Sequence, residues 1–552
     1  MNAERLLAHF EAIAEAPDAI VRLRRFVLDL GVRGKLVPQD PKDQLVTDTL
    51  RTQKIAFQAR GAFEIPASWV WISVGAVAKA RLGKMLDKAK NRGTPRRYLR
   101  NANVRWFDFD LADLLEMPFE DSELSEFALC SGDVLICEGG EPGRAAVWDE
   151  RETDIYFQKA IHRVRFLPLV NSAYFVIALK ASADDRRLAE YFTGTGIKHF
   201  TGKGLESYQF PLPPLAEQRR IVAKIDELMV LCDRLEAART EREAKRDRFT
   251  AASLGRLDVR DHNAVRYDVR FALDALAALT SRVDQVKELR QTILKLAIRG
   301  KLVPQDPNDE PAPELLKRIQ REFAKLVDDG VLNKPRPLRQ VAGSDQLFAL
   351  PTGWTLARFN EIASIQSNLV DPKHYKRMPH IAPDNIESWT ARLLPYQSIE
   401  EAGVFSGKHL FSAGAILYSK IRPNLAKVVK VDFDGLCSAD MYPIHALIDR
   451  DFLVKFMITR DFVSQAVSEE NRVAMPKINQ AALSDILVAV PPLAEQHRIV
   501  AKLDELMGIC DRLETSLSIT DETRSRLLEA LLLEALAPDR VRNLERELDV
   551  AI

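Results

Sequence analysis

The feature that most constrains this chain is a 24-residue segment that occurs twice. At a constant offset of 278 residues, PPLAEQRRIVAKIDELMVLCDRLE (213–236) lies over PPLAEQHRIVAKLDELMGICDRLE (491–514), with 20 of the 24 positions identical. Chance does not produce such agreement, so the chain contains a duplicated unit. Any fold proposed for the chain must place this segment twice and give both copies an equivalent role.

Two further repeats precede each copy. LRRFVLDLGVRGKLVPQDPKD (23–43) matches LRQTILKLAIRGKLVPQDPND (289–309), and IPASWVW (65–71) is a weaker match to LPTGWTL (350–356). The longer repeat is typical of a helix end, because a stretch with apolar periodicity is followed by a glycine and then by a proline. We therefore predict that helices stop at Gly34 and Gly300. The chain then consists of a helix end, an insert and a PPLAEQ segment, and the same series again.

The PPLAEQ segments are predicted to be helices. A proline suits the first helical position, and Glu217 or Glu495 falls in the first turn, where a carboxylate favours the helix dipole. Apolar residues then follow at spacings of 4, 3, 4 and 3, which is a heptad seam. A continuous helix over 215–249 would be on the order of 50 Å long. The seam comprises Ile221, Ile225, Leu228, Cys232 and Leu235 in the first copy and Ile499, Leu503, Leu506, Cys510 and Leu513 in the second.

Two arrangements of these helices are consistent with the seam. In the first, the two copies pair with each other as an antiparallel coiled coil related by a pseudo-twofold axis, which buries Cys232 and Cys510 in one interface. In the second, the two amphipathic helices are separate, and each is buried on its own domain. We expect the first arrangement.

The inserts, roughly 50–212 and 310–490, have a residue pattern that differs from that of the repeated segments. They carry short β-branched and apolar runs that are punctuated by Gly and Pro, which is typical of strands. Each insert is therefore expected to be a separate α+β domain. GDVLI (132–136) and GAILYSKIRPNLAKVV (414–429) are expected to occupy equivalent places, although they share few residues.

Composition limits the class of protein. No run approaches the roughly 18 consecutive apolar residues of a membrane span, and the first 30 residues are charged throughout, unlike a signal peptide. We therefore expect a cytoplasmic protein. The five cysteines lack CxxC spacing, so neither a disulfide framework nor a zinc site is indicated. With 79 basic and 79 acidic residues the net charge is zero, so any nucleic-acid binding must rest on local basic patches.

The order of these parts resembles the specificity subunits of type I restriction-modification systems, and the resemblance covers nearly the whole chain. It rests on the paired PPLAEQ…RIVAK…DELM…CDRLE blocks, the paired RGKLVPQDP ends, and MPKIN (475–479) before the second block. The sequence shows no clear counterpart of MPKIN before the first block, where HFTGKGLESYQFPLPP (199–214) stands. Equivalence of the two inserts at that point therefore stays open.

The resemblance implies an α+β fold with two α+β target recognition domains. Two long antiparallel helices separate the domains as a coiled-coil spacer, and the whole forms a pseudo-twofold repeat. The expected segments are an N-terminal helical segment (1–49), recognition domain 1 (50–212), a central helical region (213–309), recognition domain 2 (310–490) and a distal helical region (491–552).

The candidate DNA contacts are basic residues in the two inserts. The stretch 81–100 has eight basic residues and one acidic residue, together with Gly, Thr, Asn and Tyr, which suits contacts to phosphates and base edges. The alternative is that the eight carboxylates in 108–126 neutralise it. The candidates are Lys84, Lys88, Lys90, Arg92, Arg96, Arg97 and Arg100 in the first insert, and Lys373, His374, Lys376, Arg377, Lys420, Arg422, Arg472 and Lys477 in the second.

The resemblance also implies partners and an absence of catalysis. Specificity subunits of this kind bind double-stranded DNA and dock two modification subunits and restriction subunits. S-adenosylmethionine, ATP and Mg²⁺ then belong to those partners, and no cofactor, metal or membrane is expected for this chain.

The residues of the chain agree with a non-catalytic role. FTGTG (192–196) follows no apolar strand, IKHFTGKG (197–204) lacks P-loop spacing, and PDNIESW (383–389) lacks the lysine of a nuclease motif. Two alternatives stay open. One is the recognition part of a fused, type II-like restriction-methylation protein, and the other is a coiled-coil assembly scaffold.

Overall fold

The computed structural model describes residues 15–58, 60–87, 91–256, 280, 282–329, 348–467 and 476–536. The chain divides into two compact units, the first formed by 1–242 with 521–552 and the second by 243–520. The boundary falls inside the two longest helices, α9 (Leu215–Arg256) and α18 (Leu493–Leu536). These helices contain the two copies of the repeated segment, and each begins one residue after the second proline of PPLAEQ.

The first unit joins parts of α9 and α18 to an α+β domain, here called the first domain (70–212). Its other helices are α3 (Ala19–Val32), α4 (Val46–Thr52), α5 (Val74–Val77), α6 (Asp121–Phe127), α7 (Ser172–Asp184) and α8 (Gly202–Ser207). Its strands are β1 (Val70–Ser73), β2 (Ala78–Leu82), β3 (Thr94–Leu99), β4 (Leu115–Phe119), β5 (Val134–Cys137), β6 (Ala145–Val147), β7 (Tyr156–Phe157), β8 (Ile161–Phe166) and β9 (Gln209–Leu212).

The second unit joins the remaining parts of the two long helices to a second domain (355–490). Its helices are α12 (Val283–Ile298), α13 (Ala312–Asp328), α14 (Phe359–Ile362), α15 (Arg450–Met457), α16 (Arg460–Ala466) and α17 (Gln480–Asp485). Its strands are β10 (Thr355–Arg358), β11 (Ala363–Ile365), β12 (Leu369–Val370), β13 (Pro379–Ile381), β14 (Gln397–Ser398), β15 (Lys408–Phe411), β16 (Ile416–Ser419), β17 (Val428–Lys430), β18 (Gly435–Cys437), β19 (Met441–Ala446) and β20 (Leu487–Val490).

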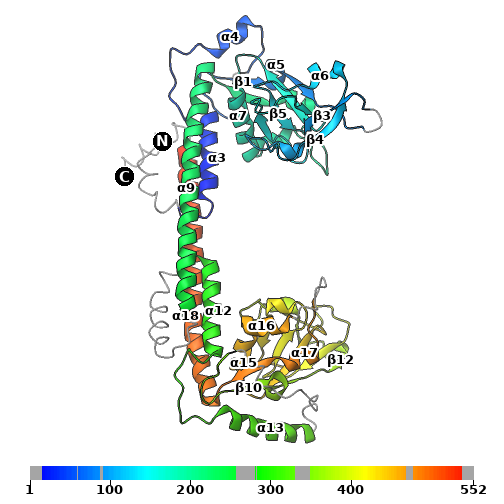
Figure 1. The fold of residues 1–552 in the computed structure, drawn as a ribbon, viewed down its shortest axis with the longest axis vertical. Helices are drawn as coiled ribbons and strands as arrows, with labels where there is room; N and C mark the ends of the chain where they lie inside the picture. The colour runs from blue at the N-terminus through cyan, green and yellow to red at the C-terminus, as the bar shows by residue number, and fades with distance from the viewer. Residues whose placement is uncertain are drawn as a thin grey trace. The chain divides into compact units, whose positions relative to one another are not determined.

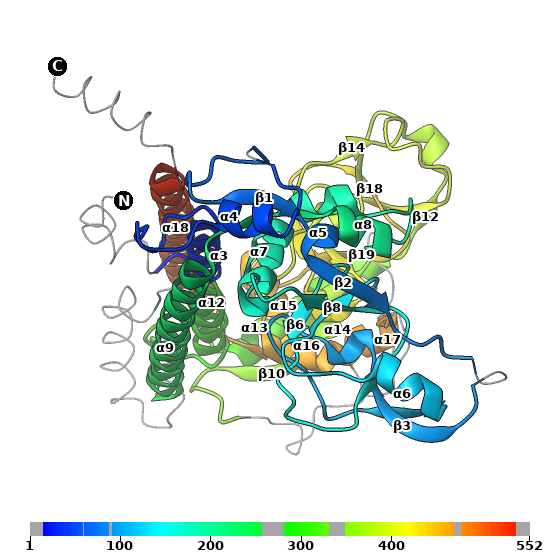
Figure 2. The same cartoon turned by 90° about the horizontal axis from the view of Figure 1, so that it is seen from above.

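The two domains share the strand order of their four-stranded sheet and of one antiparallel pair. The four-stranded sheet β2-β8-β5-β6 of the first domain corresponds to β11-β19-β16-β17 of the second, and the antiparallel pair β1-β9 corresponds to β10-β20. A parallel pair also recurs, as β3-β7 and β13-β18. In the second domain that pair lies in a five-stranded sheet, whose strands β12, β18 and β14 are labelled in Figure 2. The expected equivalence of GDVLI and GAILYSKI is confirmed, because β5 and β16 occupy the same place in the sheet.

The equivalence extends to the segment before each repeated helix. Helix α8 and strand β9 stand at the same 278-residue offset from α17 and β20 as the PPLAEQ copies. Thr201 caps α8 by accepting the Gly204 N–H, and Asn479 of MPKIN caps α17 by accepting the Ala482 N–H. Thr201 is therefore the structural counterpart of Asn479. The sequence concealed this match because a hydroxyl and an amide oxygen perform the same capping task.

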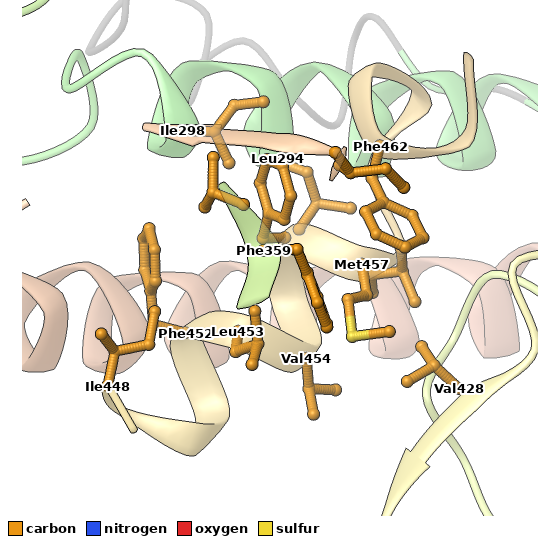
Figure 3. Packing of buried hydrophobic residues seen from close by; sticks show 14 of the residues in the cluster. Leu294, Ile298, Phe359, Val428, Ile448, Phe452, Leu453, Val454, Met457 and Phe462 are labelled. Carbon is orange, nitrogen blue, oxygen red and sulfur yellow. The ribbon is translucent and has the colours of Figure 1, made fainter. Parts of the chain in front are cut away.

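The apolar core of the second unit packs the domain directly on the helices. Leu294 and Ile298 of α12 lie against Phe359, Leu453 and Met457, and Figure 3 shows these side chains turned toward one another. The same cluster contains the seam residues Ile499, Leu503, Leu506 and Cys510 of α18. In the first unit Ile221 and Ile225 of α9 belong in the same way to the core of the first domain.

These cores correct the expectation that the two seams form one interface. Ile225 faces α3, because a Cβ on Gly31 would come within 2.8 Å of its Cδ1 atom. Its counterpart Leu503 packs in the cluster that contains α12. Figure 1 shows α3 alongside α9 and α12 alongside α18. Each seam is thus buried within its own unit by the preceding helix and domain, so Cys232 and Cys510 do not share one interface, while the two long helices and the two domains are present as expected.

The outer end of the first seam is correspondingly less buried than the heptad pattern predicts. Leu228 is half-buried and Leu235 is exposed, whereas Leu506 is fully buried and Leu513 is half-buried. At this end of the seam, Arg24 of α3 forms ion pairs with Asp233 and Glu236 of α9.

Candidate nucleic-acid interface

The three repeated motifs meet at one junction in each unit, where the domain joins its long helix. Glu217 of the first PPLAEQ accepts hydrogen bonds from Trp69 Nε1 at 2.9 Å and from the Gln39 side chain. Arg220, one helical turn on, forms a two-pronged ion pair with Asp43. Glu217 is 1% exposed, so its carboxylate is held in a nearly dry site. Burial raises the pKa of Glu217, although the bonds from Trp69 and Gln39 act in the opposite direction.

The second junction repeats the first bond for bond. Glu495 accepts from Trp354 Nε1 at 3.0 Å and from Gln305 Nε2 at 3.2 Å, and Arg498 pairs with Asp309. Burial likewise raises the pKa of Glu495.

The glutamine of PPLAEQ hydrogen-bonds the backbone of each domain where the domain meets its long helix. Gln218 is fully buried; its Oε1 accepts the Asn171 N–H at 2.7 Å, and its Nε2 donates to the carbonyls of Leu169 and Pro213. Gln496 does the same with the Asp449 N–H and the Pro491 carbonyl. In both units the side chain caps backbone groups that would otherwise be buried without partners.

The glycines of RGKL complete the junction and confirm the predicted helix stops. Gly34 has φ +68° and Gly300 has φ +66°, in the left-handed region that glycine tolerates best. A Cβ at Gly34 would also stand 2.4 Å from Pro66 Cγ and 3.2 Å from Trp69. The repeated glycine thus lets the tryptophan that donates to Glu217 approach the helix end. Sequence analysis identified all three motifs but missed that they touch one another; their joint identity in both copies was the available signal.

The basic candidates of the first domain are mostly paired within the chain. Arg96, Arg97 and Arg100 form ion pairs with Asp154, Glu152 and Asp113 respectively. The neutralising carboxylates thus come partly from 108–126, as the alternative anticipated, and partly from 152–154. Arg92 is exposed, and its guanidinium donates to the carbonyl of Asn91. Lys88 and Lys90 lie outside the described residues.

Lys84 is a correction to the candidate list. It is buried, its Nζ donates to the Pro118 carbonyl, and it pairs with Glu123. Its ammonium therefore holds β4 and α6 in place and is not presented to a ligand. A lysine in a basic stretch can be exposed in a loop or buried in an ion pair, and the sequence alone does not distinguish the two.

The second-domain candidates fall into two groups, the first of which lies in the loop between β12 and β13. The loop 371–378 carries Lys373, His374 and Arg377, all exposed, and Lys376, which lies 4.0 Å from Glu400. Neither Lys373 nor Arg377 forms an ion pair with another described residue.

The remaining second-domain candidates lie on a neighbouring pair of segments. Lys420 stacks on the ring of Tyr442 at 5.4 Å, and Arg422 N–H donates to the carbonyl of Pro476. Lys477 lies 3.3 Å from Asp440. Burial lowers the pKa of His409 in β15, and the charge of Lys420 lowers it further, which places Lys420 beside that strand. Arg472 lies outside the described residues.

The described part of the chain shows neither a metal-binding cluster nor a membrane-spanning helix. No cluster of three or more His, Cys, Asp or Glu residues there is arranged to hold a metal ion. Among the described helices, none combines the length and the apolar character that crossing a membrane requires.

Comparison with known proteins adds the family. The family model described as "Type I restriction modification DNA specificity domain" matches residues 120–245 and 351–520, which is more than half of the chain. The EcoDI specificity subunit of Escherichia coli is 39% identical over 254 residues, which cover 42% of this chain and 57% of that protein. The EcoAI specificity subunit of the same organism is 27% identical, with 93% of each chain covered.

A solved structure of a type I restriction-modification assembly contains a chain with a TM-score of 0.49 to this one, at 18% identity, covering 86% of this chain and 100% of that one. The repeated blocks, the two domains of one topology and the family match over both of them lead to the same assignment: the chain belongs to the family of type I restriction-modification DNA specificity proteins.

Proposed function

We propose that this chain is the sequence-reading subunit of a type I restriction-modification complex. It binds a duplex target made of two unlike half-sites, and each domain reads one of them. The observation that carries the proposal is the contrast between the domains. Their four-stranded sheets and their junctions correspond, whereas the segments that connect β2 to β3 and β11 to β13 share neither length nor charge pattern. Two domains with similar sheets but different loops are suited to bind two different DNA sequences.

The proposal assigns the partners and the chemistry as follows. Two modification subunits dock on the two equivalent helical regions, restriction subunits join them, and the chain itself catalyses no reaction. S-adenosylmethionine, ATP and Mg²⁺ act in those partners. The specificity subunits named among the relatives support this division.

The test is an exchange of one domain with its junction kept intact. Residues 359–486 are replaced by the equivalent segment of a family member with a different target, which retains Trp354, Gln305 and the pairing of β10 with β20. The hybrid is expressed with its modification subunits, and the methylated sequences of the cell's DNA are read. We expect one half of the target to change and the other to stay.

The matched control exchanges 74–208 of the first domain and should change the opposite half. A hybrid in which both halves change, or in which neither changes, would contradict the assignment of one half-site to each domain. The chain purified without partners, incubated with target DNA and S-adenosylmethionine, should transfer no methyl groups; measurable transfer would overturn the non-catalytic role.

A further inference from the structure

Apolar side chains are exposed beside the basic loop of the second domain. Phe405 is 80% exposed and Leu369 is 63% exposed, the two highest values among the exposed large apolar residues of that domain. Phe405 lies in the 399–407 loop between β14 and β15, and Leu369 opens β12. A single exposed apolar residue is ordinary on a protein surface. The location of this pair is what requires an explanation.

Backbone hydrogen bonds hold the loop of Phe405 against the basic loop. The Ile399 N–H donates to the Met378 carbonyl and the Glu400 N–H donates to the Lys376 carbonyl, both at 3.0 Å. Leu369 lies near the other end of the Phe405 loop, because β12 pairs with β15 and a Cβ on Gly407 would lie 3.8 Å from Leu369 Cβ. The exposed apolar residues thus adjoin the loop that carries the exposed cations Lys373 and Arg377, since that loop starts directly after β12 and is hydrogen-bonded to the Phe405 loop.

The first domain provides an independent second case. In the second domain Leu369, but not Phe405, lies in the connection that leaves β11, the first strand of the four-stranded sheet. The equivalent connection of the first domain, after β2, carries the exposed apolar residues Met85 at 57% and Leu86 at 49%, ahead of a basic stretch. The sequences of the two connections are unrelated. The recurrence of exposed apolar residues followed by cations at equivalent places in the topology therefore does not follow from sequence similarity.

We propose that Phe405 and Leu369 are specificity-determining residues of the second domain and lie against base edges in a groove of the target duplex. This inference rests on the proposed function. The cations of the adjoining loop suit the phosphates, which supply affinity independent of sequence. Apolar side chains cannot pair with phosphates, but they contact base edges such as the thymine methyl group, and this contact depends on sequence. Burial of the two side chains against DNA removes the apolar surface that the free chain exposes.

The experiment separates these two kinds of contact. The full chain is assembled with its modification subunits, and its dissociation constant is measured over a range of salt concentrations. The probes are a duplex carrying the sequence methylated by the wild-type system and a duplex lacking it. We expect Phe405→Ala to weaken binding to the target about tenfold or more while binding to the second duplex and the salt dependence stay unchanged. Lys373→Ala should instead weaken both and lower the salt slope by about one unit.

Phe107→Ala is the matched control, because Phe107 is an exposed phenylalanine of the first domain and its loss should leave discrimination in the half-site of the second domain unchanged. Substituted targets give the second readout: Phe405→Ala should lose discrimination in the half-site of the second domain only. Phe405→Leu, which keeps an apolar side chain, should retain most of the affinity.

Three results would overturn the inference. One is target binding by the Phe405→Ala, Leu369→Ala double variant equal to that of the wild type, and another is an equal loss on both duplexes. The third is loss of assembly with the modification subunits at unchanged DNA affinity, which would make the apolar pair a protein contact. Failure of the proposed function looks different, because the wild-type complex itself would then not prefer the target duplex.

Discussion

Replacing Gln218 by alanine should loosen the first domain from its helix and leave the second domain unaffected. The side chain is fully buried and makes three hydrogen bonds, whereas Gln496 makes two. A buried hydrogen bond contributes about 1 kcal/mol net, and the partners left behind stay buried. We therefore expect a cost of about 3 kcal/mol for Gln218→Ala and about 2 kcal/mol for Gln496→Ala.

Hydrogen exchange of the intact chain is the assay, because unfolding of two units cannot be treated as one two-state transition. The Asn171 and Asp449 N–H groups report on the two junctions. Gln218→Ala should speed exchange at Asn171 by about two powers of ten, since each 1.4 kcal/mol is a factor of ten. Exchange at Asp449 should not change. Gln496→Ala should give the reverse pattern, so each variant controls the other. Unchanged exchange at both groups, or equal acceleration at both, would refute the role given to the glutamines.

Other predictions follow from the unequal burial of the two copies. Leu506→Ala should lower the free energy of opening of the second unit by about 3 kcal/mol, and Leu228→Ala should lower that of the first unit by clearly less, because only Leu506 is fully buried; equal acceleration of hydrogen exchange in the two units would contradict this. Under native conditions Cys130 should be the one thiol that reacts rapidly with an alkylating reagent, because the other four are buried, and burial raises the pKa of Cys437 to about 12 and that of Cys137 to about 11. Mass spectrometry should find the remaining thiols modified only after unfolding. The raised pKa of Glu495 means that the folded chain holds this proton more tightly than the unfolded chain, a stabilisation present below the ordinary pKa near 4.5 and lost as pH rises through the folded value. Wild type should therefore lose stability relative to Glu495→Gln as the pH rises above about 4.5, and a pH-independent difference would be evidence against a desolvated carboxylate.

Local signals were sufficient for much of the fold. The helix stops at Gly34 and Gly300, the long helices after PPLAEQ and the strands β5 and β16 all follow from glycine conformation, apolar periodicity and β-branched runs. Local sequence signals could not identify which helix packs against each heptad seam. A seam records that one face of a helix is buried, but α3, α12 and the other repeated helix all present apolar faces that satisfy it. The identity of the two copies favoured self-pairing, and tertiary packing decided otherwise.

The candidate contacts were harder to predict for a related reason. Lys84 and Arg92 look alike in the sequence, yet one is buried against Glu123 and the other is exposed. What separates them is whether a carboxylate from a distant strand or helix reaches the cation, and the sequence does not contain that information. Phe405 was missed because an apolar residue in a strand-rich segment is expected to lie in a core.

The atoms used at the junctions explain how near-identical helices can carry unlike domains. Gln218 and Gln496 bind the domains only through backbone atoms, the N–H groups of Asn171 and Asp449 and the carbonyl of Leu169. The remaining junction bonds join residues that belong to the repeated motifs themselves, as between Glu217 and Trp69 or Arg220 and Asp43. Backbone groups are present whatever the side chain, so substitutions in a domain's loops leave the junction intact. The attachment of a domain to its helix is therefore independent of the loop residues proposed to read DNA, and those loops are free to differ between the two domains.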